Sequence, residues 1–179
     1  MSRPKSAFRT VAEPLAAAVV LAFVVRAAIR IYSIPSESMM PTLEAGDRIV
    51  ATPYLFSDPQ RGHVVVFRSA TNPDELVVKR IIAVPGDLVD AQYGRVRVGG
   101  HTLPEPYLLR QGSSGTFTAQ IVAPESYFVA GDNRGSSYDS RQWGPLPRAR
   151  IIGRARLVLW SSHDTATSGR GRRLFKWIE

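Results

Sequence analysis

The sequence predicts a mostly β protein that follows a single apolar helix. Beyond residue 45, short runs of β-branched residues alternate with Gly and Pro turn signals, the pattern of an antiparallel β domain. No stretch shows the β–α–β alternation of a Rossmann-like sheet. The only long apolar run, residues 15–25, comes before this region. We therefore expect a complex of antiparallel sheets preceded by one N-terminal transmembrane helix.

Length, charge and composition narrow the class of protein. The chain has 179 residues, 44% of them apolar, which suits one globular domain plus an anchor. It has no cysteine, so disulfides, thiolate nucleophiles and cysteine metal sites are excluded. A net charge of +8 fits either nucleic acid or an anionic membrane surface. Much of the charge flanks the apolar segment or lies near the C-terminus, and no basic helix carries interleaved aromatics, which argues against nucleic acid.

The apolar run is too short to cross a bilayer without help. Its eleven residues fall below the ~20 that a spanning helix needs. The helix becomes long enough if it continues to about Ile34, with Arg26 and Arg30 reaching the interface at its far end. A buried amphipathic helix and a removable secretory signal are the alternatives. We expect a single uncleaved anchor.

These observations predict the domain organisation. The parts are a basic cytoplasmic N-terminus (1–13), a transmembrane anchor (14–34) and a β-rich domain outside the membrane (35–179). Within that domain, residues 103–125 contain three prolines and a Gly/Ser-rich stretch, so we expect a short excursion or an appended ribbon. Gly99-Gly100 is an expected hairpin turn. The C-terminal residues 174–178 mix aromatic and basic side chains, which suits a membrane interface or a terminal strand equally.

A hydroxyl-rich loop directly after the expected anchor is a candidate for nucleophilic chemistry. Pro35 and Pro41 forbid a regular helix across it, so Ser38 lies on a stiff, mostly extended loop. Such a serine becomes a nucleophile only if a base takes its proton. The chain's three histidines are scattered through a strand start, a turn and a polar tail, with no recognisable triad.

Lys79 is the better candidate for that base. It lies in a run of β-branched residues, where strand alternation places it on one face with Val77 and Ile81. If that face is buried, desolvation favours the neutral amine, and lowering its pKa from ~10.4 to ~7.5 costs about 4 kcal/mol. A neutral amine can act as general base for a serine. The alternative is an edge-strand lysine that extends to water.

A polar loop at residues 131–141 follows a predicted strand. It is rich in hydroxyls and charges but lacks the Gly-Lys-Ser/Thr ending of a phosphate loop. Asp132, Asn133 and Asp139 do not have EF-hand spacing, so no metal site is expected. A loop of this kind can orient a buried amine and hold itself rigid by an Asp–Arg pair.

Together these segments resemble the type I signal peptidases (leader peptidases), membrane-anchored serine proteases with a Ser–Lys dyad. The resemblance covers the apolar anchor and several boxes in the family's order. They are Ser36-Glu37-Ser38-Met39-Met40-Pro41-Thr42, Gly46-Asp47, Arg61-Gly62-His63-Val64-Val65-Val66-Phe67, Lys79-Arg80-Ile81-Ile82-Ala83-Val84-Pro85-Gly86-Asp87, Gly131-Asp132-Asn133-Arg134, Ser137, Asp139-Ser140-Arg141 and Trp143-Gly144. Each box alone is a moderate signal, and their combination is specific.

The resemblance implies the catalytic groups. Ser38 is the nucleophile and Lys79 the general base. Ser36 supplies the side-chain donor of the oxyanion hole, beside the backbone N–H of Ser38.

The resemblance also implies supporting residues. Ser137 matches the serine that hydrogen-bonds and orients the lysine. Asp139 and Arg141 match a structural pair beside the site. Arg80 follows the lysine as usual in the family, and Met39 helps to line the substrate region.

The implied function is that of a membrane-bound serine endopeptidase. It removes N-terminal signal peptides from secreted preproteins and cleaves after small residues at the first and third positions before the bond. The substrate adds as an extended strand to a sheet edge. The implied partners are secretory preproteins and membrane lipid, with no nucleic acid, no metal and no cofactor.

The implied location is the bacterial cytoplasmic membrane, with one pass, the N-terminus inside and the catalytic domain outside. The mitochondrial inner-membrane branch also uses Ser–Lys, and we favour bacteria because no transit peptide precedes the anchor. Two departures from the family are the compact size and a charged residue, Glu37, where a small one is common.

Three rival readings are weaker. A catalytically dead binding protein of this fold would not fill every reactive position. A self-cleaving repressor would need a DNA-binding domain, for which the first 30 residues are too few and too apolar. A penicillin-binding enzyme is suggested only by Ser2-Arg3-Pro4-Lys5, which lies in the basic tail.

Overall fold

The computed structural model describes residues 11–20, 29–69, 71–161 and 173–178. They belong to two units, Met1–Arg30 and Ile31–Glu179. In the first unit, residues 11–20 are helical and mostly exposed. None of the helices within the described ranges has the length and apolarity needed to span a membrane.

The expected anchor helix at residues 14–34 is wrong at its C-terminal end. Residues 21–28 of that segment lie outside the described residues, and Arg30–Ser33 form strand β1 instead of helix. The reason is that Ile34 inserts into the core of the second unit, where it is 3% exposed. Its N–H donates to Asp47 O, and its own carbonyl accepts from Gly46 N. Strand pairing and the burial of Ile34 therefore stabilise a strand here, and the helix does not extend to residue 34.

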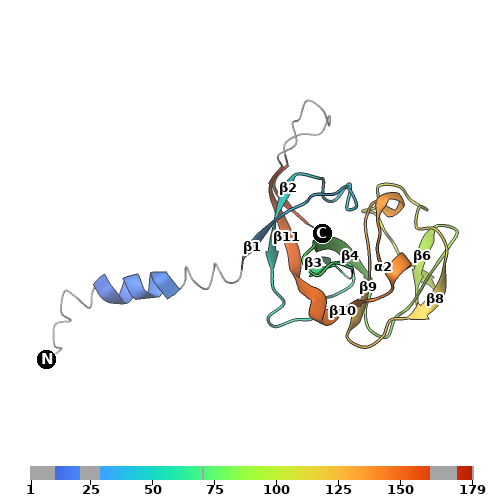
Figure 1. Ribbon diagram of the computed structural model, residues 1–179, viewed down its shortest axis with the longest axis horizontal. Coiled ribbons are helices and arrows are strands. Elements are labelled where there is room, and N and C mark those ends of the chain that lie inside the picture. The colour runs from blue at the N-terminus through green and yellow to red at the C-terminus, as the bar shows by residue number, and fades with distance from the viewer. Residues whose placement is uncertain (1–10, 21–28, 70, 162–172, 179) are drawn as a thin grey trace. The chain divides into compact units, whose positions relative to one another are not determined.

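The second unit is built on an eight-stranded sheet, and every pairing reported for its strands is antiparallel (Figure 1). Seven strands lie in the order β1 (Arg30–Ser33), β2 (Asp47–Thr52), β11 (Ile151–Ser161), β3 (Val64–Arg68), β4 (Leu76–Ala83), β9 (Ser126–Ala130) and β10 (Leu146–Pro147). The eighth, β12 (Leu174–Trp177), pairs with β11. The prediction of a mostly β, antiparallel domain is confirmed.

A second sheet has the order β7 (His101–Thr102), β6 (Arg95–Val98), β5 (Leu88–Gln92) and β8 (Phe117–Ile121). The expected turn at Gly99-Gly100 joins β6 to β7, and both glycines have positive φ, as this tight turn requires. The expected excursion at 103–125 contains β8, which returns to pair with β5. Three short helices complete the described part of this unit: η1 (Arg134–Ser136), α2 (Ser140–Trp143) and η2 (Arg148–Arg150).

Apolar side chains cover both faces of the large sheet. Residues 64–67 of β3 are all buried because alternate positions face two different clusters. One cluster, with Met39 and Leu43, packs beneath the Ser38 loop. The other, with Phe67, Ile81 and Leu146, lies on the face to which Lys79 belongs. A third cluster lies between the small sheet and the ends of β4 and β9.

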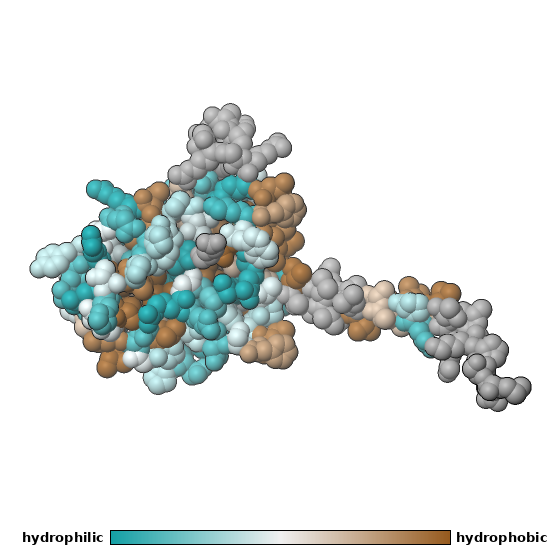
Figure 2. Space-filling view, turned by 180° about the vertical axis from the view of Figure 1, so that it is seen from behind, coloured by the Kyte–Doolittle hydropathy of each residue, from teal (hydrophilic) through white to brown (hydrophobic). Residues whose placement is uncertain are grey.

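Some large apolar side chains remain exposed at the β1, β11 and β12 edge of the large sheet. They are Ile31, Trp160, Leu174, Phe175 and Trp177. Seen from behind, brown apolar surface gathers along one side of this unit (Figure 2).

Candidate active site

The loop after β1 is held from below by its own apolar side chains. Met39 and Leu43 are 1% and 0% exposed, and Leu43 N donates to Met39 O at 2.9 Å. A second turn bond joins Met40 N to Glu37 O at 3.1 Å. These contacts fix the backbone of Ser38, whose side chain is nearly buried. The loop is thus fixed in place, as predicted, but residues 38–42 form hydrogen-bonded turns instead of the expected mostly extended backbone.

Lys79 meets this serine directly. Its Nζ lies 2.6 Å from Ser38 Oγ, and the lysine is 3% exposed. Burial lowers the pKa of Lys79 from 10.5 to about 8, partly opposed by the charge of Asp139 and supported by that of Arg141. The buried face predicted from strand alternation is therefore confirmed, and the direction of the pKa shift agrees with the expected desolvation. An amine with such a pKa is neutral in a substantial fraction of molecules near pH 8.

A second hydroxyl completes the group. Ser36 Oγ lies 3.3 Å from Ser38 Oγ, and Ser36 is exposed at the mouth of the site. It is thus free to point at an oxygen that develops charge beside the nucleophile.

The loop after β9 holds the backbone of the nucleophile by hydrogen bonds. Asn133 N donates to Ser38 O at 3.0 Å, and Asn133 Nδ2 donates to Glu37 O at 3.3 Å. Gly131 passes so close that an added Cβ would come within 3.0 Å of both Ser38 O and Ser137 Oγ. Only glycine fits this crossing.

Ser137, Asp139 and Arg141 form one connected group. Asp139 is fully buried and pairs with Arg141 through Nε at 2.7 Å and Nη2 at 2.9 Å, so the expected structural pair is present. Asp139 also caps α2 and accepts a bond from Gly131 N. Ser137 Oγ donates to Asp139 at 2.6 Å, and within the described residues no hydrogen bond joins it to Lys79. The expected direct contact of Ser137 with the lysine is therefore not found.

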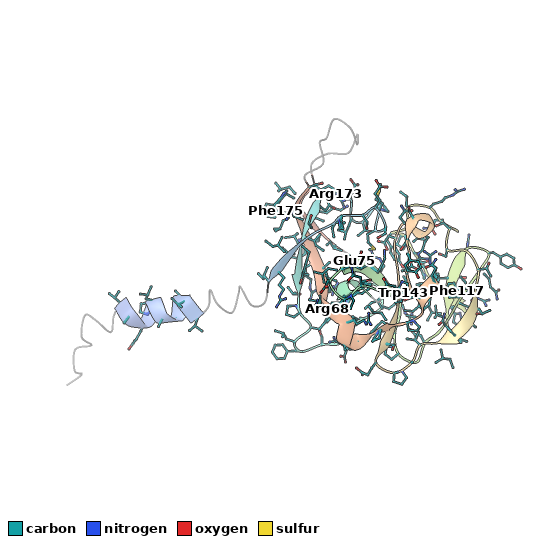
Figure 3. The ribbon with its side chains drawn as sticks, in the orientation of Figure 1. Arg68, Glu75, Phe117, Trp143, Arg173 and Phe175 are labelled. Atoms are coloured by element: carbon teal, nitrogen blue, oxygen red, sulfur yellow. The ribbon has the colours of Figure 1, made fainter. Side chains whose placement is uncertain are left out.

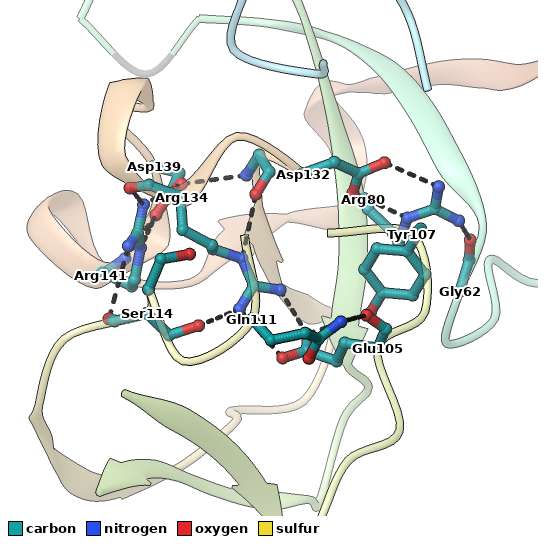
Figure 4. A network of polar contacts seen from close by, with 12 residues as sticks. Gly62, Arg80, Glu105, Tyr107, Gln111, Ser114, Asp132, Arg134, Asp139 and Arg141 are labelled. Atoms are coloured by element: carbon teal, nitrogen blue, oxygen red, sulfur yellow. Dashed lines mark hydrogen bonds and ion pairs between the residues drawn. The ribbon is translucent and has the colours of Figure 1, made fainter. Parts of the chain in front are cut away.

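Arg80 follows Lys79 in β4, so its side chain points to the opposite face of the sheet. Figure 4 shows the Arg80 side chain beside Asp132, Gly62 and Tyr107. It makes a two-point bond to Asp132 at 2.9 and 2.8 Å and donates to Gly62 O at 2.8 Å. Tyr107 covers its guanidinium, whose carbon lies 4.0 Å from the ring centre. Asp132 also accepts a bond from Thr42 in the Ser38 loop. This one carboxylate thus joins the nucleophile loop to the lysine strand.

A buried ion pair ties the 103–125 excursion to the same loop. Arg134 pairs with Glu105, and the two side chains are 0% and 4% exposed. Arg134 Nε donates to Gly131 O at 3.0 Å, and Nη1 donates to Ser114 Oγ. Sequence reasoning missed Glu105 and Ser114 because nothing in an irregular, proline-rich stretch marks which polar groups become buried.

Arg173 holds the loop from the C-terminal side. It pairs with Asp47 at 2.8 Å and lies 3.6 Å from Glu44. It also donates to the carbonyl oxygens of Pro41 and Thr42. In the sequence, the basic residues near the C-terminus indicate only net charge, and the structure gives Arg173 a specific role in holding the loop.

Two pockets of about 280 Å³ each flank Ser38. They share Ser36, Ser38, Glu75 and Val77. One extends over Met39 and Val78, so Met39 belongs both to the core and to a pocket wall. The other extends past Lys79 toward Trp143, which Figure 3 labels.

The edge of β4 beside these pockets is open. Residues 76–79 pair with β3 on one side, whereas β9 pairs with β4 only from Arg80 onward. In the described part of the chain, the other edge of residues 76–79 has no strand partner. An extended peptide can therefore add to this edge.

Neither histidine in the described part of the chain approaches Ser38. His63 Nδ1 bonds to Tyr54 at 2.9 Å and to Gln60 N, and burial lowers the pKa of His63 to about 4. His101 lies exposed in β7, and position 163 falls outside the described residues. Among the described residues, no group of three or more His, Asp or Glu side chains could hold a metal ion.

Comparisons with known proteins agree with this geometry. Residues 8–160 match the family described as signal peptidase, peptidase S26. A signal peptidase I from Leptolyngbya laminosa is 41% identical over 136 residues, which cover 71% of this chain and 66% of the relative. A probable signal peptidase I-2 from Synechocystis is 36% identical over 167 residues, 89% of this chain and 76% of the relative.

A solved structure is also similar. The crystal structure of a signal peptidase I from Enterococcus faecalis V583 is 29% identical, with a TM-score of 0.51. The match covers 56% of this chain and 98% of that one. The chain spans about two thirds of the length of the Leptolyngbya relative, at 66%.

Proposed function

Because the chain belongs to the signal peptidase family, peptidase S26, we infer that it is a serine endopeptidase that removes N-terminal signal peptides from preproteins. The observation that carries the proposal is the buried contact of 2.6 Å between Lys79 Nζ and Ser38 Oγ. A lysine is normally costly to bury, and here its amine is aimed at a hydroxyl. The pair has the reach of a nucleophile and its general base.

In the first step, Ser38 Oγ attacks the carbonyl carbon of the scissile peptide bond. The hydroxyl proton passes to the neutral Nζ of Lys79, which becomes an ammonium. The carbonyl oxygen takes the negative charge, and Ser36 Oγ and the backbone N–H of Ser38 donate to it. When the C–N bond breaks, the Lys79 ammonium gives its proton to the leaving amine, and an ester to Ser38 remains.

In the second step, water replaces the amine. Neutral Lys79 takes a proton from the water as the oxygen attacks the ester carbon. The ammonium then returns the proton to Ser38 Oγ, which leaves as the hydroxyl. A lysine base has no ring tautomer to fix, so it needs no triad aspartate. We propose that Ser137 acts on Lys79 through Asp139, because Ser137 Oγ donates to that carboxylate and its charge acts on the lysine.

The substrate is proposed to bind extended, as an added strand on the open edge of β4. The open backbone at residues 76–79 and the two pockets beside Ser38 support this. The pocket over Met39 is walled in part by apolar side chains such as Ile34 and Val78. We propose that it receives a side chain of the signal peptide and that cleavage follows small residues, as the family resemblance implies.

We propose that the enzyme works at the bacterial cytoplasmic membrane, with an N-terminal anchor that begins near residue 14 and the catalytic unit outside. The helical residues 11–20 and the apolar run from residue 15 support an anchor. Exposed aromatic side chains at Trp160, Phe175 and Trp177 suit a membrane interface. The proposed partners are secretory preproteins and membrane lipid.

The test is cleavage of a purified secretory preprotein by the detergent-solubilised full chain. We expect one cut, after a small residue, with Ser38→Ala and Lys79→Met inactive while both variants remain folded. Full activity in either variant would show that Ser38 and Lys79 are not the nucleophile and its general base. Cleavage at many unrelated sites by the wild-type protein would contradict a dedicated signal peptidase.

A further inference from the structure

One carboxylate stands where the two pockets of the site meet. Glu75 lines both pockets together with Ser36, Ser38 and Val77. Within the part of the chain that the structure describes, Lys79 is the one other charged side chain that lines either of them. Lys79 serves as the base through its neutral form, so Glu75 sets the charge that a bound substrate meets along this groove.

Strand geometry fixes where this charge lies. Glu75 precedes β4 and shares the face of Val77 and Lys79, because side chains at every second position point the same way. Its backbone is held across the hairpin, since Ser69 N donates to Glu75 O at 2.9 Å and Glu75 N donates to Asn72 O at 3.0 Å. Four strand positions separate it from Lys79, a distance of roughly 13 Å. A peptide lying along β4 therefore passes Glu75 about four residues from its scissile bond.

The carboxylate of Glu75 is available to a substrate. Glu75 is exposed, and in the described part of the chain no Lys, Arg or His nitrogen lies within ion-pair distance of it. Arg68 of the same hairpin faces the other side of the strand pair and donates to Pro73 O at 3.2 Å, and Arg150 donates to the carbonyl oxygen of Ser69 at 2.6 Å. Figure 3 labels both Glu75 and Arg68.

We propose that Glu75 is a specificity-determining residue that favours substrates with a Lys or Arg side chain near the cleavage site. The preferred position lies three to five residues from the scissile bond, on the flank that runs along the open edge of β4. This inference rests on the proposed function and names the substrate class of the same site. An exposed charge pair of this kind changes kcat/KM by about two- to fivefold, and salt screens it.

The experiment moves one lysine along a cleavable peptide. A parent peptide carries a signal-peptide cleavage site, and each derivative places Lys or Glu at one position on either side of the bond. The full-length enzyme in detergent is assayed for kcat/KM with every Lys and Glu pair. We expect a preference for Lys of about two- to fivefold at one position or two adjacent ones, falling toward unity as salt rises from about 0.05 to 0.5 M.

The variants separate a groove contact from general charge. Glu75→Gln should abolish the preference and Glu75→Lys should reverse it. Glu37→Gln removes the same charge from an exposed residue that lines neither pocket, so it should keep the preference. Asp74→Asn, an exposed neighbour outside both pockets, should change neither the rate nor the preference.

The outcomes distinguish the two levels of the proposal. If wild type and Glu75→Gln cleave the parent equally and show the same Lys-to-Glu ratio at every position, Glu75 does not set specificity, although the peptidase function stands. If Glu37→Gln loses the preference as well, the effect is one of overall charge and the groove contact is refuted. If the wild-type enzyme cleaves no peptide of the set, the proposed function itself fails.

Discussion

Lys79 and Arg80 are neighbours on β4, both are buried, and they point to opposite faces of the sheet. Lys79 reaches the hydroxyl of Ser38 at 2.6 Å, whereas Arg80 makes a two-point bond to Asp132. Because Asp132 also accepts from Thr42, the charged arginine holds the loop that presents the serine. One strand thus delivers a base whose pKa is lowered by burial and a cation that is fully paired.

The activity should depend on the titration of Lys79. Only the neutral amine can accept the proton of Ser38, and burial lowers the pKa of Lys79 to about 8. We expect kcat/KM to rise about tenfold per pH unit well below pH 8 and to level off above it. The measurement is a pH–rate profile on a peptide without titratable groups. A profile that is flat from pH 6 to 9 would show that some other group is the base.

Removing the amine should stabilise the folded protein. Burial disfavours the charged form of Lys79, and a fall in pKa from 10.5 to about 8 corresponds to roughly 3 kcal/mol at about 1.36 kcal/mol per pH unit. The unfolded state binds more protons between pH 8 and 10.5, so the wild type gains stability as pH rises through that window.

Lys79→Met fills a similar volume without a charge. Below pH 8 it should gain on the order of 1–3 kcal/mol in the free energy of unfolding, measured by urea denaturation. The difference from wild type should shrink toward pH 10.5. A variant that is less stable than wild type at pH 6 would mean that the lysine is not under desolvation strain.

Strand periodicity predicted the buried lysine of the site. The alternation of Val77, Lys79 and Ile81 indicates a buried lysine from sequence alone, and the structure places all three on one face. The register with β3 could not be read in this way, because it depends on which strands become neighbours. The pairing of Val65 with Lys79 is a property of the assembled sheet.

Long-range polar contacts were beyond prediction for a related reason. Glu105 and Arg134 lie 29 positions apart, and no local pattern couples a proline-rich stretch to a loop after a strand. The expected bond of Ser137 to Lys79 was also not found, since the tertiary packing places the Ser137 hydroxyl at hydrogen-bond distance from Asp139. The end of the anchor helix was misplaced because Ile34 satisfies a helix pattern and a β core equally well.

The hydroxyl of Ser36 should act on the transition state. It lies 3.3 Å from Ser38 Oγ and is exposed, so its removal leaves the packing intact. We expect Ser36→Ala to lower kcat by ~10²–10³ with KM little changed, as for other oxyanion donors. Ser36→Thr keeps the hydroxyl and should restore part of the rate. A Ser36→Ala variant with the wild-type kcat would show that the Ser36 hydroxyl does not stabilise the oxyanion.

Gly131 should tolerate no side chain. An added methyl would come within 3.0 Å of the carbonyl of Ser38, which accepts from Asn133 N, and so would displace the nucleophile. We expect Gly131→Ala to lose ~10²-fold in kcat/KM, since a shift of about 1 Å has that effect on a reacting group. Gly135→Ala is the matched control in the same loop, because its Cβ would meet open space. Equal activity of the two variants would refute the tight crossing.

The C-terminal segment should act as a support for the nucleophile. Arg173 binds Asp47 at 2.8 Å and the carbonyl oxygens of Pro41 and Thr42, which follow Ser38 in one loop. Asp47 is fully buried, so Arg173→Gln leaves a buried carboxylate without its cation. We expect about a tenfold loss in kcat with KM little changed, and partial rescue by Arg173→Lys, which restores the charge but only one point of contact.

The control for Arg173 breaks an ion pair elsewhere. Arg97 makes a two-point bond to Asp90 within the small sheet, outside the loop and both pockets. Arg97→Gln should keep the wild-type kcat. All variants are assayed at a temperature where circular dichroism shows each to be fully folded, which separates a displaced serine from a smaller folded fraction. If folded Arg173→Gln turns over as fast as wild type, the C-terminal segment does not position Ser38.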